Sequence, residues 1–170
     1  DLYDLKMSTT PAAVMFGADL DASFNKSLTD IAATLRLDTL KYSYATGEMH
    51  ISDIVARLNS VDSVTNASIR NRDMFAFFST PMLLMPFVDS LARVTPVMDR
   101  LNAEHKISVT ELQAALPPFN LAISGGNNNM VGRILAGSEM SLSNFSVNAS
   151  NDSLINFDAR VLGFNSPTIR

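Results

Sequence analysis

The feature that most restricts the fold of this chain is a strict alternation of apolar and polar residues near its carboxyl end. The alternation runs over residues 142–150 and again over 153–162. Its apolar members are Phe145, Val147, Ala149, Ile155, Phe157, Ala159 and Val161, and its polar members include Asn144, Ser146, Asn148, Asn156, Asp158 and Arg160. Successive side chains of a strand point to opposite faces, and Asn-Asp between two such runs is typical of a tight turn. The pattern therefore predicts an antiparallel β-hairpin over 142–162 with one buried face.

The rest of the chain carries mixed signals. Apolar residues separated by three or four positions predict a helix over 19–36, and a second helical region over 81–106 that Pro86 and Pro96 interrupt. Ser108 and Glu111 match a capping box that begins a short helix ending at the two prolines 117–118. Further short helices are expected over 54–61 and 129–136, and strands over 37–45, 48–51, 63–70, 74–78 and 119–123.

These elements indicate the α+β class, with a mixed or antiparallel sheet and helices on one face. Both halves of the chain read as helix, strand, helix, strand, strand, which is compatible with two ferredoxin-like split βαβ units. We expect an arm or irregular lead-in over 1–18, a first α+β unit over 19–80 and a second over 81–170. One continuous domain is the alternative.

Composition excludes several functional classes. The 170 residues include no Cys, which removes disulfide frameworks, thiolate metal sites and Cys nucleophiles. Only 18% are charged, while 19 Ser, 11 Thr and 14 Asn supply the polarity. A net charge of −4 without a basic block argues against a nucleic-acid partner. A hydrophobic content of 46% excludes a disordered chain.

One Gly-rich loop is the candidate small-ligand site. A strand ending at Ser124, then two glycines, then a helix near residue 129 could present backbone N–H groups to an anion. The predicted anion-binding set is Ser124, Gly125, Gly126, Asn127 and Arg133. The G-x-S-x-G motif of a catalytic serine is not matched because position 122 is Ala, and no His follows residue 105. We therefore expect no catalytic residues.

Metal and cofactor signals are weak. His50 lies two residues from Glu48, so both side chains can point to one side of a strand, but no third ligand is evident. His105 has no partner one helical turn away. We expect neither a metal nor a cofactor. The longest apolar run, 82–88, is too short to span a membrane, although an anchor upstream of Asp1 is compatible with the sequence.

An interaction surface is the hypothesis that remains. Between residues 107 and 150 only Glu111, Arg133 and Glu139 are charged, and obligate interfaces are depleted in charge. The predicted interface residues are Asn144, Ser146, Asn148, Asn156, Asp158 and Arg160. We expect a non-enzymatic structural or assembly subunit of an oligomer, contacting copies of itself or other proteins, with a virus or phage particle as the favoured setting. The alternatives are an extracytoplasmic platform domain of a pilus or secretion machine, and a small enzyme or anion-binding domain using residues 124–129.

Overall fold

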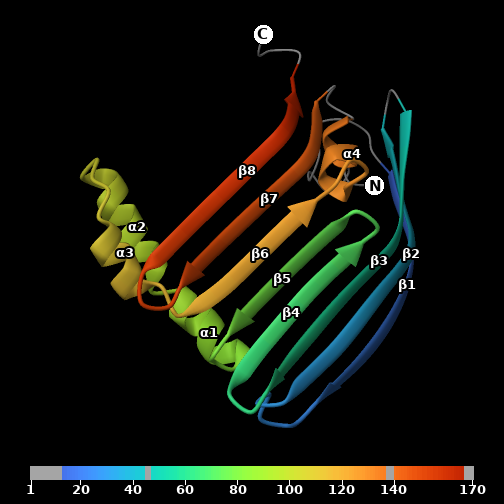
Figure 1. Cartoon of the computed structure of the whole chain (residues 1–170). Helices are drawn as coiled ribbons and strands as arrows, with labels where there is room; N and C mark the ends of the chain where they lie inside the picture. The colour runs from blue at the N-terminus through green and yellow to red at the C-terminus, as the bar shows by residue number, and fades with distance from the viewer. Residues whose placement is uncertain (1–12, 45–46, 137–139, 167–170) are drawn as a thin grey trace.

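The fold is one eight-stranded antiparallel sheet in which every strand pairs with its neighbours in the sequence (Figure 1). The computed structural model describes residues 13–44, 47–136 and 140–166. The strands are β1 (Ala13–Phe24), β2 (Ile31–Tyr44), β3 (Gly47–Val61), β4 (Val64–Asn71), β5 (Met74–Thr80), β6 (Phe119–Gly125), β7 (Ser141–Asn151) and β8 (Ile155–Asn165). The sheet is strongly twisted, so β1 and β2 are seen nearly edge-on where β4–β8 are seen face-on.

Four helices lie at the two ends of the strands. Helices α1 (Leu84–Leu91), α2 (Val94–Ala103) and α3 (Val109–Ala115) connect β5 to β6 at one end, and α4 (Met130–Ala136) precedes β7 at the other. Phe87 of α1 is buried and packs on Phe78 of β5, with ring centroids 4.9 Å apart. An ion pair of Arg100 with Glu111 joins α2 to α3, and hydrogen bonding to Arg100 lowers the pKa of Glu111.

Several local predictions are confirmed. The hairpin over 142–162 corresponds to β7 and β8, and the strands expected on either side of residues 71–73 are β4 and β5. The side chain of Ser108 accepts a hydrogen bond from the N–H of Glu111, so it caps α3 as the capping box requires. The helical region over 81–106 is broken into α1 and α2, as its prolines indicated. The lead-in over 1–18 lies mostly outside the described residues, and β1 begins within it.

Two helix predictions are wrong. Residues 19–36 form the end of β1, a turn and the start of β2, and residues 54–61 belong to β3. Residues four apart share a face in a helix and also in a strand, so the spacing of Leu20 to Phe24 fits both. The turn between β1 and β2 is closed by Asn25, whose side-chain oxygen accepts the N–H groups of Thr29 and Asp30.

The predicted ferredoxin-like duplication is also absent from the strand order. A split βαβ unit needs a helical crossover between non-adjacent strands, whereas all seven pairings here join consecutive antiparallel strands. The broad α+β assignment holds, but the sheet dominates the described residues far more than the sequence indicated.

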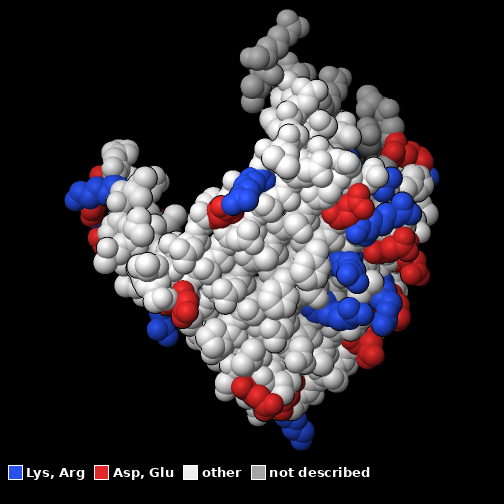
Figure 2. Space-filling view, viewed as in Figure 1, with Lys and Arg blue, Asp and Glu red and all other residues white. Residues whose placement is uncertain are grey.

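The strand register divides the sheet into two chemically different faces. The apolar face carries Leu20, Leu35, Leu58, Ile69, Phe78, Leu121, Val147 and Phe157, one from each strand. The polar face carries Asp21, Thr34, Arg57, Ser68, Ser79, Asn120, Asn148 and Asp158. No charged side chain lies on the apolar face in the central parts of the eight strands. These parts are residues 18–24, 31–37, 54–61, 64–71, 74–80, 119–125, 145–151 and 155–161. Figure 2 shows charge concentrated over the β1–β4 side of the visible face.

Buried polar side chains secure the helices to the strand ends. The amide nitrogen of Asn151 donates to the carbonyls of Gln113, Leu116 and Pro117, beside α3. At the opposite end, the amide nitrogen of the fully buried Asn129 donates to the carbonyls of Gly126 and Leu142. Buried backbone carbonyls need such partners because an unpaired one costs free energy comparable to a lost hydrogen bond.

Candidate interaction surface

The most unusual feature of the structure is that no second layer covers the middle of the apolar face within the described residues. Ile69, at the centre of β4, is 40% exposed, and Phe157 of β8 is 70% exposed. An apolar sheet face is normally buried against another layer, so this face lacks its usual partner.

The uncovered part of the apolar face is a long strip. On β4 the buried ends Thr65 and Asn71 are six residues apart, which corresponds to about 20 Å of strand. Helices α1 and α4 lie at opposite ends of the central strands, and a helix about 10–12 Å across fits between the two buried ends of β4. The strip crosses eight strands, and their seven spacings add up to about 34 Å.

The predicted interface residues are brought together on the opposite, polar face. Ser146 lies opposite Arg160, and Asn148 lies opposite Asp158, on the β7–β8 pair. Asn144 is separate from them: its backbone φ is 48°, and its amide donates to the side-chain oxygen of Asn127.

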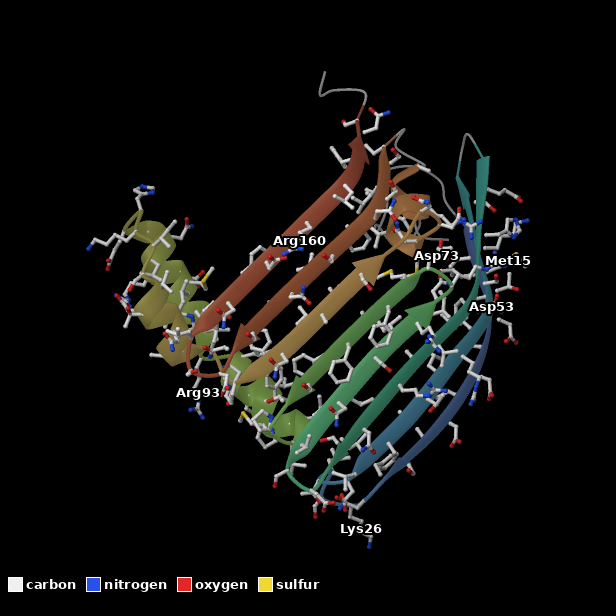
Figure 3. The ribbon with its side chains drawn as sticks, in the orientation of Figure 1. Met15, Lys26, Asp53, Asp73, Arg93 and Arg160 are labelled. Atoms are coloured by element: carbon white, nitrogen blue, oxygen red, sulfur yellow. The ribbon has the colours of Figure 1, made fainter. Side chains whose placement is uncertain are left out.

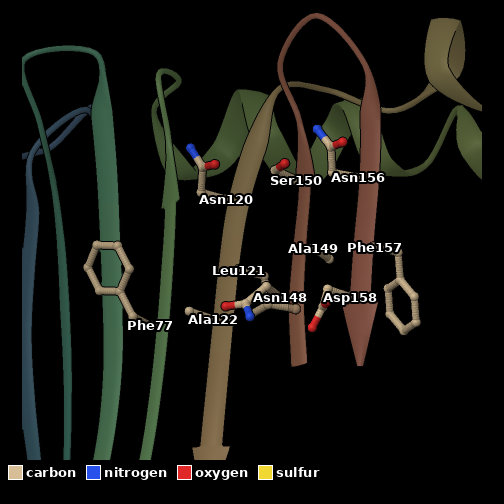
Figure 4. A pocket seen from close by; sticks show the side chains of 10 residues that line it. All are labelled: Phe77, Asn120, Leu121, Ala122, Asn148, Ala149, Ser150, Asn156, Phe157 and Asp158. Atoms are coloured by element: carbon tan, nitrogen blue, oxygen red, sulfur yellow. The ribbon is translucent and has the colours of Figure 1, made fainter. Parts of the chain in front are cut away.

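Part of this polar group lines a shallow groove of about 380 Å³. Figure 4 shows its wall on β5–β8, formed by Phe77, Asn120, Leu121, Ala122, Asn148, Ala149, Ser150, Asn156, Phe157 and Asp158. Asp158 is the only ionisable side chain among these lining residues, and its carboxylate lies 3.2 Å from the Nε of Arg160. The groove thus offers amides and a neutralised carboxylate, which suit weak polar contacts better than chemistry.

The predicted anion-binding loop follows β6 and has an acceptor of its own. Asp73, at the β4–β5 turn, accepts the N–H of Gly126 through its carbonyl at 2.7 Å and the N–H of Asn128 through its carboxylate at 3.1 Å (Figure 3). Gly125 is buried, while Ser124 and Arg133 are exposed. An anion at this loop would meet the Asp73 carboxylate, so anion binding stays a prediction that this geometry does not favour.

His50 and Glu48 lie on one side of β3, as their spacing predicted. The His50 Nε2 is 3.5 Å from the Glu48 carboxylate, which also pairs with Lys41 at 2.9 Å. The hydrogen bond from Lys41, aided by His50, lowers the pKa of Glu48. Within the described ranges, no group of three or more metal-binding side chains comes together. Searching those same ranges also finds no helix with the length and apolarity needed to cross a membrane.

The sequence reasoning missed the two features that distinguish this surface. Only the β7–β8 part of the apolar strip is predicted from the sequence, and there as a buried face, because alternation reports which side chains share a face and not what lies against it. The buried asparagines gave no distinct signal among 14 Asn residues. Comparison with protein-family models, with curated proteins and with solved structures finds no match to this chain.

Proposed function

We propose that this chain is a non-enzymatic structural or assembly subunit whose apolar face is covered by a protein partner. The observation that carries the proposal is the apolar strip, which crosses all eight strands without a charged side chain and stays partly exposed. Monomeric soluble proteins rarely expose contiguous apolar patches of more than a few hundred Å², and larger patches mark interaction sites.

The dimensions of the strip suit a polypeptide partner. An α-helix with its side chains is about 10–12 Å across, which fits within the roughly 20 Å between the buried ends of β4. A helix about 34 Å long has roughly 23 residues, so one amphipathic helix could cover the strip. The setting we favour is a virus or phage particle, because low charge and abundant Ser, Thr and Asn fit a surface shared among subunits.

The other two settings have less support. The platform-domain alternative depended on a duplicated ferredoxin-like order, and the eight-stranded meander does not contain one. The anion-binding alternative depended on free N–H groups in the 124–129 loop, where Asp73 already accepts two of them.

An apolar small ligand is a second candidate occupant. The observation that favours it is the uniform chemistry of the strip: the groove over β2–β4 is lined by Ala33, Leu35, Ala56, Leu58, Ala67 and Ile69, with Arg57 and Ser68 at its border. An acyl chain needs no polar group to be held there. The Ile69 substitution described below distinguishes an acyl chain from a protein partner.

The test places a charge in the middle of the strip. Replacing Ile69 by lysine should weaken association of the chain at least about 100-fold, because an ammonium group buried in an apolar interface is left unpaired. The variant should keep its free energy of unfolding within about 1 kcal/mol, because a half-exposed lysine stem can lie along the surface. Sedimentation velocity measures the association, and denaturant unfolding measures the free energy of unfolding. Binding of the dye 1-anilinonaphthalene-8-sulfonate reports whether the apolar strip is exposed.

The matched control is Ser68→Lys, which puts the same charge on the polar face of the same strand. Association that is lost only in Ile69→Lys supports a protein-covered apolar face. Equal behaviour of both variants and the parent, with a dye-free monomer throughout, contradicts the proposal. Fatty acid retained by the parent in native mass spectrometry and released by Ile69→Lys supports the small-ligand candidate instead.

A further inference from the structure

The two outer edges of the sheet form a second surface, separate from the apolar face. Among the described residues, β1 and β8 have no strand on their outer sides, and they lie at opposite edges of the sheet (Figure 1). Met15 of β1 and Arg160 of β8 mark these two edges in Figure 3. Edge strands are often protected from further pairing by lysine, proline, other charged residues or a β-bulge. Neither β1 nor β8 contains lysine or proline, and the β-bulge of β1, at Gly17/Ala18, precedes the residues 20–24 considered below.

The backbone geometry of an eight-stranded meander makes these edges complementary. In a strand, one residue directs its N–H and C=O groups toward the neighbouring strand on one side, and the next residue directs them toward the other side. Along an antiparallel sheet, the hydrogen bonds of one strand pair are therefore made by residues whose side chains lie on one face, and those of the next pair by residues of the other face. With eight strands, the free groups of β1 and of β8 therefore belong to residues of the same face. Pairing β8 of one copy with β1 of the next continues the antiparallel sheet, with apolar and polar faces both preserved.

Charge selects one register for this pairing. Asp19 of β1 already pairs with Arg36 at 3.6 Å, whereas Asp21 makes no ion pair within the described residues. Placing Asp21 opposite Arg160 of the next copy gives that carboxylate a cation on the polar face. The Arg160 guanidinium already pairs with Asp158 at 3.2 Å, so in this register it would lie between two carboxylates. A slip of two residues in one direction would instead place Asp21 opposite Asp158, which is unfavourable.

The same register matches the apolar side chains of the two edges. It places Phe24, 69% exposed, opposite Phe157, 70% exposed, and Leu20 opposite Val161. Aromatic and branched pairs opposite one another are the stabilising cross-strand pairs of antiparallel sheets. A slip of two residues in the other direction would leave Phe24 opposite Ala159 and Arg160 opposite Ser23.

We propose that β8 of one copy of this chain pairs with β1 of a second copy, in the register that places Asp21 opposite Arg160 and Phe24 opposite Phe157. The contact is head-to-tail, so it leaves one free β1 and one free β8 on every pair and can continue into a ring or a filament. It goes beyond the proposed function because it uses the strand edges and a second copy, whatever covers the apolar face.

Single-cysteine cross-linking tests the register, and the absence of native Cys makes every added thiol unique. A mixture of Phe24→Cys and Phe157→Cys chains should oxidise to a disulfide-linked pair, because opposed residues have Cα atoms about 4.5–5.5 Å apart. Two further mixtures are the controls for the slipped registers. Each combines Phe24→Cys chains with a second variant, Ile155→Cys in one mixture and Ala159→Cys in the other. Dominant linkage to position 155 or 159, or linkage of Phe24→Cys only to itself, overturns the proposal.

Charge exchange gives a second readout. Asp21→Lys should raise the dissociation constant of self-association by roughly 5- to 10-fold, because like charges then face one another, and adding Arg160→Asp should restore it. The edge contact is contradicted if the Asp21→Lys, Arg160→Asp double variant associates no more tightly than Asp21→Lys alone. A parent chain that remains monomeric at its solubility limit contradicts it as well. Ile69→Lys should leave the position 24–157 disulfide intact, so failure of the apolar-face proposal can be recognised separately.

Discussion

Replacing Asn129 by alanine should lower the free energy of unfolding by about 3 kcal/mol, since three hydrogen bonds of one buried side chain are lost together. The Asn129 amide nitrogen donates to the Gly126 carbonyl at 2.6 Å and to the Leu142 carbonyl at 2.8 Å, and its oxygen accepts the Gly132 N–H at 2.7 Å. Asn129 is fully buried, so water cannot readily take over these bonds. Chemical denaturation followed by far-ultraviolet circular dichroism measures the loss.

The matched control for this substitution is Asn127→Ala in the same loop. Asn127 is exposed, and its side chain accepts one hydrogen bond from the amide of Asn144 at 2.6 Å. Its removal should cost less than about 1 kcal/mol, because solvent can replace the lost partner. Equal losses in the two variants would show that Asn129 does not secure α4 to the sheet.

Truncating Phe87 to alanine should cost about 3–5 kcal/mol, the range for removing a buried phenylalanine. The Phe87 ring is 7% exposed and packs on Phe78, so its loss leaves a cavity between α1 and the sheet. The structure offers few other anchors there: Thr65 donates to the carbonyl of Met82, and Ser60 accepts the N–H of Leu84. Thermal and denaturant unfolding of the purified variant measure the effect.

Val88→Ala is the control for the aromatic anchor, since Val88 is the next residue of α1 and is 48% exposed. Its truncation should change the free energy of unfolding by less than about 1 kcal/mol. A Phe87→Ala variant as stable as Val88→Ala would mean that α1 contributes little to the fold. A large loss confined to Phe87→Ala supports the placement of α1 over the strand ends.

The structure also shows why some elements could be predicted and others could not. The hairpin of β7 and β8 was predictable because strict alternation over nine or ten residues has no helical interpretation. The cap of α3 was predictable because Ser108 precedes Glu111 by the three residues that let its side chain accept the Glu111 N–H. Both signals depend only on residues close together in the chain.

The helix predicted over 19–36 failed for a reason that local patterns cannot remove. A spacing of four is even, so Ile31 and Leu35 share a face in β2 as they would in a helix. Leu28, which seemed to join the two halves of the stripe, lies in the turn with a φ of 53° and is 41% exposed. Pairing with β3 supplies the backbone hydrogen bonds that make the strand preferable.

The candidate surface was predictable only in part. The sequence indicated that the carboxyl-terminal third is poor in charge and offers a polar strand face at Ser146, Asn148 and Asp158, and the register does place these residues together. The apolar strip and the two complementary edges did not follow from any segment alone. They arise from combining eight strands, because continuity across a sheet depends on the register of each pair.

By itself, the sequence determined which residues alternate between apolar and polar and where prolines and a capping box limit the helices. It also determined that the chain has no Cys. Only the tertiary structure decided that one meander replaces two ferredoxin-like units, and that no second layer from the described residues covers the middle of the apolar face. The physical reason is that periodicity records the direction of a side chain relative to its own backbone. Burial depends on what other parts of the molecule, or other molecules, lie against that side chain.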